Sequence, residues 1–248
     1  SYNNLYLYQC LKNYYITTPI YYVNDKPHIG HAYTSIACDV IARFKRLDGY
    51  NVKFLTGTDE HGQKVEKAAI SQNKTPIEYA DFISKDFRSL TEILNLSNDD
   101  FIRTTEKRHK IASENLWKKL YENNHIYLGK YSGWYALKDE AFYSEKEITN
   151  GKAPSGAEVT WVEEESYFFD LSKWQNKLLD FYNKNPDFID PKSRMNEVKS
   201  FVQSGLRDLS VSRTSFAWGV KVPESENHIM YVWLDALTNY LSAVGYPD

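Results

Sequence analysis

Cysteine is scarce in this chain of 248 residues, which has two, Cys10 and Cys38. Two thiols can form neither a disulfide framework nor a cysteine-based zinc cluster, and they fit a reducing compartment. We therefore expect a cytoplasmic protein, with an organelle as the alternative location. The length is sufficient to bury a core without disulfides, and it corresponds to one large domain or two modest ones.

Long apolar runs and a strong charge of either sign are also missing. No stretch approaches the roughly 20 consecutive apolar residues of a membrane span, so no membrane partner is expected. The first 13 residues are polar and rich in tyrosine, without the apolar core of a secretory signal. The formal net charge of −3 argues against a protein that holds nucleic acid by bulk electrostatics.

The first half of the chain has an α/β pattern. Residues 14–18 form a β-branched and aromatic run that predicts a buried strand. Apolar residues at helical spacing follow and end at Asp48-Gly49, and residues 52–56 predict a second strand that Gly57 ends. This order implies a parallel pair with a right-handed crossover. The predicted core face of the helix consists of Ile29, Tyr33, Ile36, Ala37, Val40, Ile41, Phe44 and Leu47.

Two more helices are expected before the pattern changes. Thr75 and Glu78 are typical of a capping box, with Pro76 at the first helical position. This helix is predicted to extend to about Leu94, and another covers about 105–123.

From about Ile126 the pattern becomes one of short aromatic strands separated by glycine, proline and asparagine. Two helices follow, one from Ser172 with Gln175 as a capping box and one over 193–204. Residues 228–233 then predict an apolar strand, and 235–244 a helix. We interpret 1–125 as an α/β domain, 126–226 as an inserted α+β module and 227–248 as a return to the first domain.

Candidate functional residues follow the predicted parallel strands, beyond whose carboxyl ends ligands bind. The first loop brings Asn24, His28, Gly30 and His31 to a helix N-terminus. The two histidines are three residues apart and can face one bound group, while Gly30 leaves room for a ligand. The free N–H groups and dipole of this turn suit a phosphate, and two imidazoles can donate hydrogen bonds to charge developing on phosphorus.

Less specific interpretations of these residues stay open. A histidine near a helix start is often a cap or a surface residue. A zinc site is a second alternative, in which four side chains would converge on the metal: His28, His31, Asp59 and His61.

Three further features each have two interpretations. Asp59 is either a helix cap or the partner of a substrate ammonium group. Tyr22 and Trp233 are either core aromatics or the walls of an apolar slot. The basic cluster 106–110 is expected to be a solvated helix face rather than a contact with nucleic acid.

Five segments together resemble the methionyl-tRNA synthetases, a family of class I aminoacyl-tRNA synthetases. In this order they cover nearly the whole chain from about Tyr14. The segments are His28-Ile29-Gly30-His31 after the loop Thr17 to Tyr22, Phe54 to Gly62, Asp100 to Thr105, Asp208 to Arg213, and Tyr231 to Tyr240.

The resemblance implies a Rossmann-like parallel sheet, split by an inserted connective module. It implies a methionine–tRNA ligase, in which the carboxylate of methionine attacks the α-phosphate of ATP, supplied with Mg²⁺, and the resulting methionyl group is transferred to the methionine tRNA. His28 and His31 would be catalytic and, with Asn24 and Gly30, would bind ATP. The residues implied to bind methionine are Ile20, Tyr22, Asp59, Tyr231 and Trp233.

The sequence departs from the family pattern in two ways. Residues 132–140 lack the Cys-x-x-Cys knuckles of many members, so we expect no structural zinc. The second signature, a Lys-Met-Ser-Lys-Ser-type loop, and the helical anticodon-binding domain are missing. We therefore expect this chain to be the N-terminal part of a longer synthetase and poorly active without the remainder. The alternatives are a nucleotidylyltransferase of the His-x-Gly-His type and a non-catalytic fragment that acts as a binding module.

Overall fold

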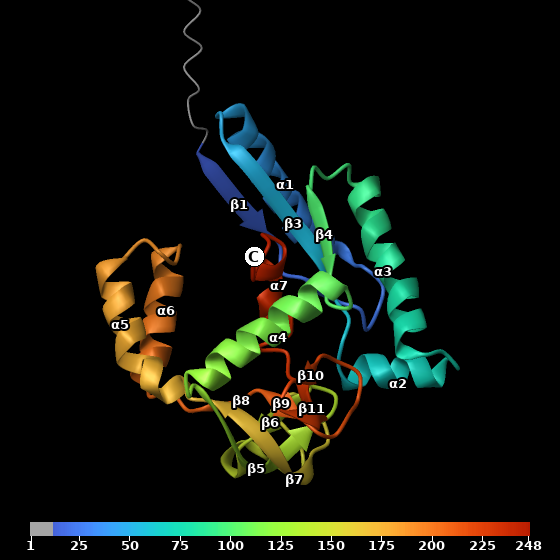
Figure 1. Ribbon diagram of the computed structural model, residues 1–248, viewed down its shortest axis with the longest axis vertical. Coiled ribbons are helices and arrows are strands. Elements are labelled where there is room, and N and C mark those ends of the chain that lie inside the picture. Colours follow the sequence, from blue (N-terminus) through green and yellow to red (C-terminus); the bar gives the residue numbers. More distant parts are fainter. Residues whose placement is uncertain (1–11) are drawn as a thin grey trace, which may run out of the picture. The chain divides into compact units, whose positions relative to one another are not determined.

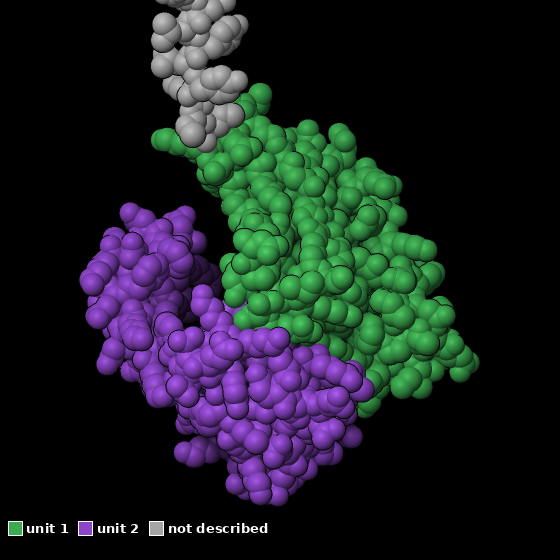
Figure 2. Space-filling model, in the orientation of Figure 1, with its two compact units in different colours: residues 1–115, 218–220, 234–248 green, residues 116–217, 221–233 purple. Residues whose placement is uncertain are grey.

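The computed structural model describes residues 12–248 (Figure 1). Cys10 and most of the polar first segment therefore lie outside the described residues. The chain divides into two compact units, coloured separately in Figure 2. Unit 1 comprises residues 1–115, 218–220 and 234–248, and unit 2 comprises 116–217 and 221–233. The predicted boundaries near 125 and 226 stay predictions. No described helix is long and apolar enough to cross a membrane.

Unit 1 is built on a parallel sheet in the order β1-β3-β2, with β4 also paired to β3, as the α/β prediction required. Its strands are β1 (Asn13–Thr17), β2 (Tyr21–Tyr22), β3 (Asn51–Asp59) and β4 (Asp100–Arg103). Its helices are α1 (Ile29–Leu47), α2 (Gln63–Ser71) and α3 (Pro76–Ile93), joined by the start of α4 (Lys107–Glu122) and by the returning turns η3 (Ala236–Thr238) and α7 (Asn239–Ser242). Neither α2 nor β4 was predicted from the sequence.

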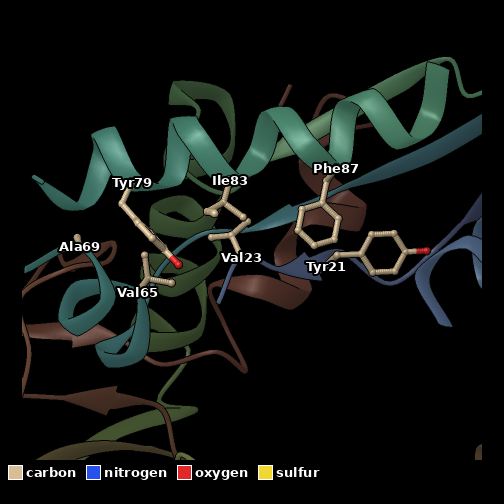
Figure 3. Packing of buried hydrophobic residues seen from close by; sticks show 7 residues of the cluster. All are labelled: Tyr21, Val23, Val65, Ala69, Tyr79, Ile83 and Phe87. Atoms are coloured by element: carbon tan, nitrogen blue, oxygen red, sulfur yellow. The ribbon is translucent and has the colours of Figure 1, made fainter. Parts of the chain in front are cut away.

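The core beside β2 is formed mainly by α2 and α3. Thr75 caps α3 as predicted: its Oγ1 accepts from Glu78 N (3.3 Å), and Glu78 Oε2 accepts from Thr75 N (2.8 Å). Figure 3 shows the ring of Phe87 beside that of Tyr21, with centroids 5.8 Å apart. This packing fixes the strand that leads into the site. The whole cluster is Tyr21, Val23, Val65, Ala69, Tyr79, Ile83 and Phe87.

The predicted end of a strand at Gly57 is wrong. The strand β3 continues through Gly57 to Asp59, and Gly57 pairs with Ile102 of β4. A Cβ atom at Gly57 would lie 2.0 Å from the carbonyl oxygen of Ile102. Glycine is needed here because two backbones approach closely, not because the chain turns. The prediction that residues 14–18 are a buried strand is also wrong in part, since β1 ends the sheet order and Tyr15 is exposed.

The predicted core face of α1 is wrong, although its helix is confirmed. The large apolar side chains of that face are exposed, from 42% at Ile41 to 89% at Leu47. The residues that α1 buries are Ser35, Asp39 and Ala42. Helical periodicity identifies an apolar stripe, but the side of the helix that is covered depends on the packing partner, and here small and polar residues face it.

Unit 2 contains two antiparallel sheets and a pair of helices. One sheet has the order β6-β5-β7-β8, from β5 (Ile126–Ala136), β6 (Ala141–Tyr143), β7 (Thr160–Phe169) and β8 (Leu209–Ser210). The other has the order β10-β11-β9, from β9 (Ser212–Arg213), β10 (Lys221–Val222) and β11 (Ser225–Met230). The helical elements are η1 (Glu145–Glu147), η2 (Leu171–Trp174), α5 (Gln175–Lys184) and α6 (Lys192–Gln203).

Two predictions for unit 2 need correction. The strand predicted over 228–233 lies earlier, as β11, and the capping box of Ser172 with Gln175 does not form. The Ser172 hydroxyl donates instead to Asp208 Oδ1 (2.5 Å), and Gln175 Oε1 accepts from Leu206 N (2.8 Å). Both polar side chains therefore bind the segment after α6, a partner that a local motif does not reveal.

Candidate functional site

The N-terminus of α1 is closed by two histidines. His28 is the residue before the helix, and its Nδ1 accepts from Gly30 N (3.1 Å). The Nδ1 of His31 accepts from His28 N (3.0 Å). Because each Nδ1 is an acceptor, the proton of a neutral ring must be on Nε2. The cap thus sets the tautomer of both rings and leaves two Nε2–H donors for another group.

The two rings differ in their surroundings. Their ring centroids lie 3.8 Å apart, but His28 is exposed and His31 is half-buried. The ring centroid of His31 lies 4.6 Å from that of Tyr21 and 5.1 Å from that of Phe87. Burial lowers the pKa of His31, and the neighbouring His28 lowers it further. His31 is therefore a neutral hydrogen-bond donor at neutral pH.

Gly30 has a local reason for being glycine. A Cβ atom there would lie 2.9 Å from Cε1 and 3.0 Å from Nδ1 of His28. Any side chain at this position would therefore displace the ring that caps the helix. The role of Gly30 in leaving room for ATP stays a prediction beside this finding.

Asp59 ends β3 at the carboxyl edge of the sheet. Between residues 54 and 61 it alone is not buried. Its carbonyl oxygen accepts from Val23 N (3.1 Å), and β2 places Tyr22 opposite it in register. Tyr22 is half-buried against the core cluster beside β2. The structure thus brings together two of the residues predicted to bind methionine.

The remaining predicted residues are less closely grouped. Asn24 is exposed in the turn after β2, and Ile20 is half-buried beside Leu55 and Ile102. Tyr231 and Trp233 belong to unit 2, so their joining the other residues in one pocket stays a prediction.

Within unit 2, Tyr231 has well-defined contacts. Its ring lies against the guanidinium of Arg213 (3.8 Å), and its hydroxyl donates to the carbonyl oxygen of Glu140. Trp233 is 47% exposed.

The alternative zinc site is wrong. Within residues 12–248 there is no group of three or more histidine, cysteine or carboxylate side chains that could hold a metal ion. The Nδ1 atoms of His28 and His31 accept backbone N–H groups, and His61 Nδ1 lies 2.7 Å from Asp235 Oδ2.

A buried network in unit 1 was not predicted from the sequence. The fully buried His109, expected on a solvated face, lies with its Nε2 2.9 Å from Asp235 Oδ1. A signal existed, because His109, Ser113 and Trp117 repeat at helical spacing on α4 and all three are fully buried. That periodicity would have placed His109 inside.

Comparisons with known proteins identify the family of this chain. A family model described as "tRNA synthetases class I (M)" matches residues 14–159 and 146–248. The methionine–tRNA ligase of Rickettsia felis is 67% identical over 240 residues, covering 96% of this chain and 47% of that protein. The methionine–tRNA ligase of Mesorhizobium japonicum is 56% identical over 242 residues, with the same coverage of 96% and 47%.

A solved structure is similar too. The methionyl-tRNA synthetase of Mycobacterium tuberculosis in complex with methionyl-adenylate has a TM-score of 0.92 and 54% sequence identity, covering 96% of this chain and 48% of that one. The chain spans about half the length of the curated relatives it matches. By sequence and by fold, it belongs to the methionyl group of class I tRNA synthetases.

Proposed function

We propose that this chain carries the methionine- and ATP-binding part of a methionine–tRNA ligase. The observation that carries the proposal is the double-histidine cap of α1, which leaves two Nε2–H donors at a helix N-terminus. The dipole of a helix N-terminus also favours phosphate binding. Because the backbone N–H of Gly30 already donates to His28, the imidazoles would supply the donors here. The identity of 67% to a methionine–tRNA ligase supports methionine and ATP as the substrates.

In the proposed first step, a carboxylate oxygen of methionine forms a bond to the α-phosphorus of ATP. The bond from that phosphorus to the bridging oxygen breaks, and pyrophosphate leaves with Mg²⁺. Negative charge shifts onto the phosphate oxygens, and donors placed in advance by His28 and His31 stabilise it. Asn24 and Gly30 complete this side of the ATP site. No protein group has to gain or lose a proton, which suits a neutral His31.

Methionine would be held by its ammonium group and by its side chain. The carboxylate of Asp59 would pair with the ammonium. The side-chain pocket would be formed by Ile20, Tyr22, Tyr231 and Trp233. Contacts between sulfur and aromatic rings are worth about 0.3–1.5 kcal/mol each, so an aromatic pocket suits a thioether.

The proposal includes partners outside these 248 residues. The second step needs the methionine tRNA, whose terminal ribose hydroxyl attacks the carbonyl carbon of the adenylate and releases AMP. The second ATP-site loop and an anticodon-binding domain would belong to the remaining half of the synthetase, in the cytoplasm. The exposed apolar face of α1 supports such a larger assembly, because large apolar patches mark interaction sites.

The test is methionine-dependent exchange between ATP and pyrophosphate by the full-length protein. His31→Ala should lower the exchange rate about 10²- to 10³-fold, the usual effect of removing one such donor. His125→Ala, a histidine of unit 2 outside the site, is the matched control and should retain the rate. An unchanged rate in His31→Ala would contradict the role of His31. Exchange that depends on a substrate other than an amino acid would favour a nucleotidylyltransferase.

A further inference from the structure

A buried carboxylate of unit 1 contacts the loop that follows β3. Asp235 is 2% exposed, and its two oxygens each meet a buried histidine. Its Oδ2 lies 2.7 Å from Nδ1 of His61, and its Oδ1 lies 2.9 Å from Nε2 of His109. The other ring nitrogen of His109 lies 3.1 Å from Ser242 Oγ. None of these groups has a part in the proposed reaction.

The charges of this network are balanced inside the protein. Burial opposes a charged His61, but the carboxylates of Asp235 and Asp59 outweigh it and, against the opposing effect of Lys110, raise the pKa of His61. The two histidines likewise outweigh burial at Asp235 and hold the pKa of that carboxyl well below its usual range. The contact is therefore an ion pair of imidazolium and carboxylate, and a buried charge is tolerated only when it is paired.

The pair lies next to the residue proposed to bind the substrate ammonium. His61 is two positions after Asp59, and the residue between them, Glu60, is fully buried. Arg103 donates two hydrogen bonds of 2.7 Å to the Glu60 carboxylate, and Trp218 Nε1 donates to the Glu60 carbonyl oxygen (2.6 Å). Contacts to Glu60 and His61, the two residues that follow Asp59, therefore fix the loop. Asp59 itself is only half-buried.

One ring nitrogen of His61 makes the choice of histidine costly. Its Nε2 is buried and has no hydrogen-bond partner within the described part of the chain. A buried donor without a partner is costly, and an apolar residue at this position would avoid that cost. What an apolar residue could not provide is the contact of the loop with Asp235.

We propose that His61 and Asp235 are positioning residues for Asp59, whose carboxylate they hold at the end of β3 where it binds the ammonium group of the amino acid. This inference rests on the proposed function and adds to it two residues on which the affinity for methionine depends. The rival explanation is that the pair only attaches residues 234–248 to unit 1. In that case loss of the pair would lower the stability of the protein, and the KM for methionine would not change more than the KM for ATP.

Two substitutions at His61 distinguish these explanations. In His61→Asn, the side-chain amide nitrogen can occupy the place of Nδ1 and still donate to Asp235, whereas His61→Leu has no donor. We expect His61→Leu to raise the KM for methionine about tenfold, equivalent to about 1.4 kcal/mol, with the KM for ATP within about twofold of the wild-type value. His61→Asn should restore most of the methionine affinity. His125→Asn, in unit 2, is the matched control.

Each outcome of these exchange measurements on the full-length protein has a clear meaning. A wild-type protein without methionine-dependent exchange would refute the proposed function itself. An active wild type with an unchanged KM for methionine in a folded His61→Leu variant would overturn the positioning role alone. Equal increases of both Michaelis constants would overturn it as well.

A measurement on the wild-type chain decides the matter if His61→Leu does not fold. The Cε1 proton of His61 should titrate in the NMR spectrum with a pKa above the reference value of about 6.5, and its resonance should shift when methionine is added. A pKa of His61 at or below that reference would overturn the proposal. A resonance that does not shift in saturating methionine would overturn it as well.

Discussion

The Nδ1 atom of His31 accepts the backbone N–H of His28 at 3.0 Å, so the second histidine closes the helix turn that the first one opens. Each ring uses its Nδ1 for the helix, and its Nε2 is the atom proposed to bind the ligand. The two histidines therefore have a structural role in the cap beside their proposed catalytic role, and substitutions can separate these roles.

His31→Asn is expected to keep the cap and lose the donor. The asparagine oxygen can accept the N–H of His28 as Nδ1 does, but no Nε2–H remains for a phosphate. The rate of pyrophosphate exchange should fall about 10²- to 10³-fold, while the thermal midpoint stays near the wild-type value. His31→Ala, which loses both functions, should also be less stable. Wild-type exchange by the asparagine variant would contradict the donor role.

Acidic pH is expected to inactivate the site through His31. Burial, with His28 second, lowers the pKa of His31, so the neutral ring is favoured in the folded chain. The resulting stability is present above the unfolded pKa of about 6.5 and is lost as pH falls through the folded pKa. Protonation puts a hydrogen on Nδ1 and removes the acceptor for His28 N. Exchange measured from pH 7.5 to 5 should therefore decline in the wild type, whereas the residual activity of His31→Asn should lack this decline.

Gly57→Ala is expected to destabilise the chain by about 3 kcal/mol or more, because the new Cβ would meet a backbone oxygen that cannot move aside. Without a shift of the backbone, this Cβ would lie 2.0 Å from the carbonyl oxygen of Ile102. Urea unfolding measures the loss. Gly129→Ala in β5 is the control, since its Cβ would lie 3.1 Å from the ring of Phe168, a side chain that can adjust at a cost of about 1 kcal/mol. Equal losses of unfolding free energy in the two variants would contradict the explanation that the close approach of β3 and β4 requires glycine at position 57.

Chelation is expected to leave the stability of the chain unchanged. The segment 132–140 lacks cysteine, and a small apolar cluster of Ala136, Ala153 and Ala157 lies where β5 ends. This cluster offers no metal ligand. Thermal unfolding with and without EDTA should coincide, and elemental analysis should give well below one zinc per chain. One tightly bound zinc per chain would refute the expectation.

Features that depend on neighbouring residues were predicted well. The Thr75–Glu78 box and the limits of α1 and α6 involve groups within about four positions of one another. The end of α6 likewise depends on a nearby residue, Gly205, which has a φ of +105°, because glycine tolerates the left-handed conformation that ends many helices. Features that depend on distant partners were not predicted. Ser172 binds Asp208 instead of forming a local cap.

The sequence by itself determined the strand–helix–strand order around α1, the histidine pair at the start of α1 and membership of the synthetase family, because periodicity, caps and motifs are read within short stretches of chain. Only the tertiary structure decided which side of α1 is covered, and that His61 and His109 share Asp235. The physical reason is distance along the chain: Asp235 lies 174 positions from His61 and 126 from His109, and no local pattern specifies which surfaces meet across such separations.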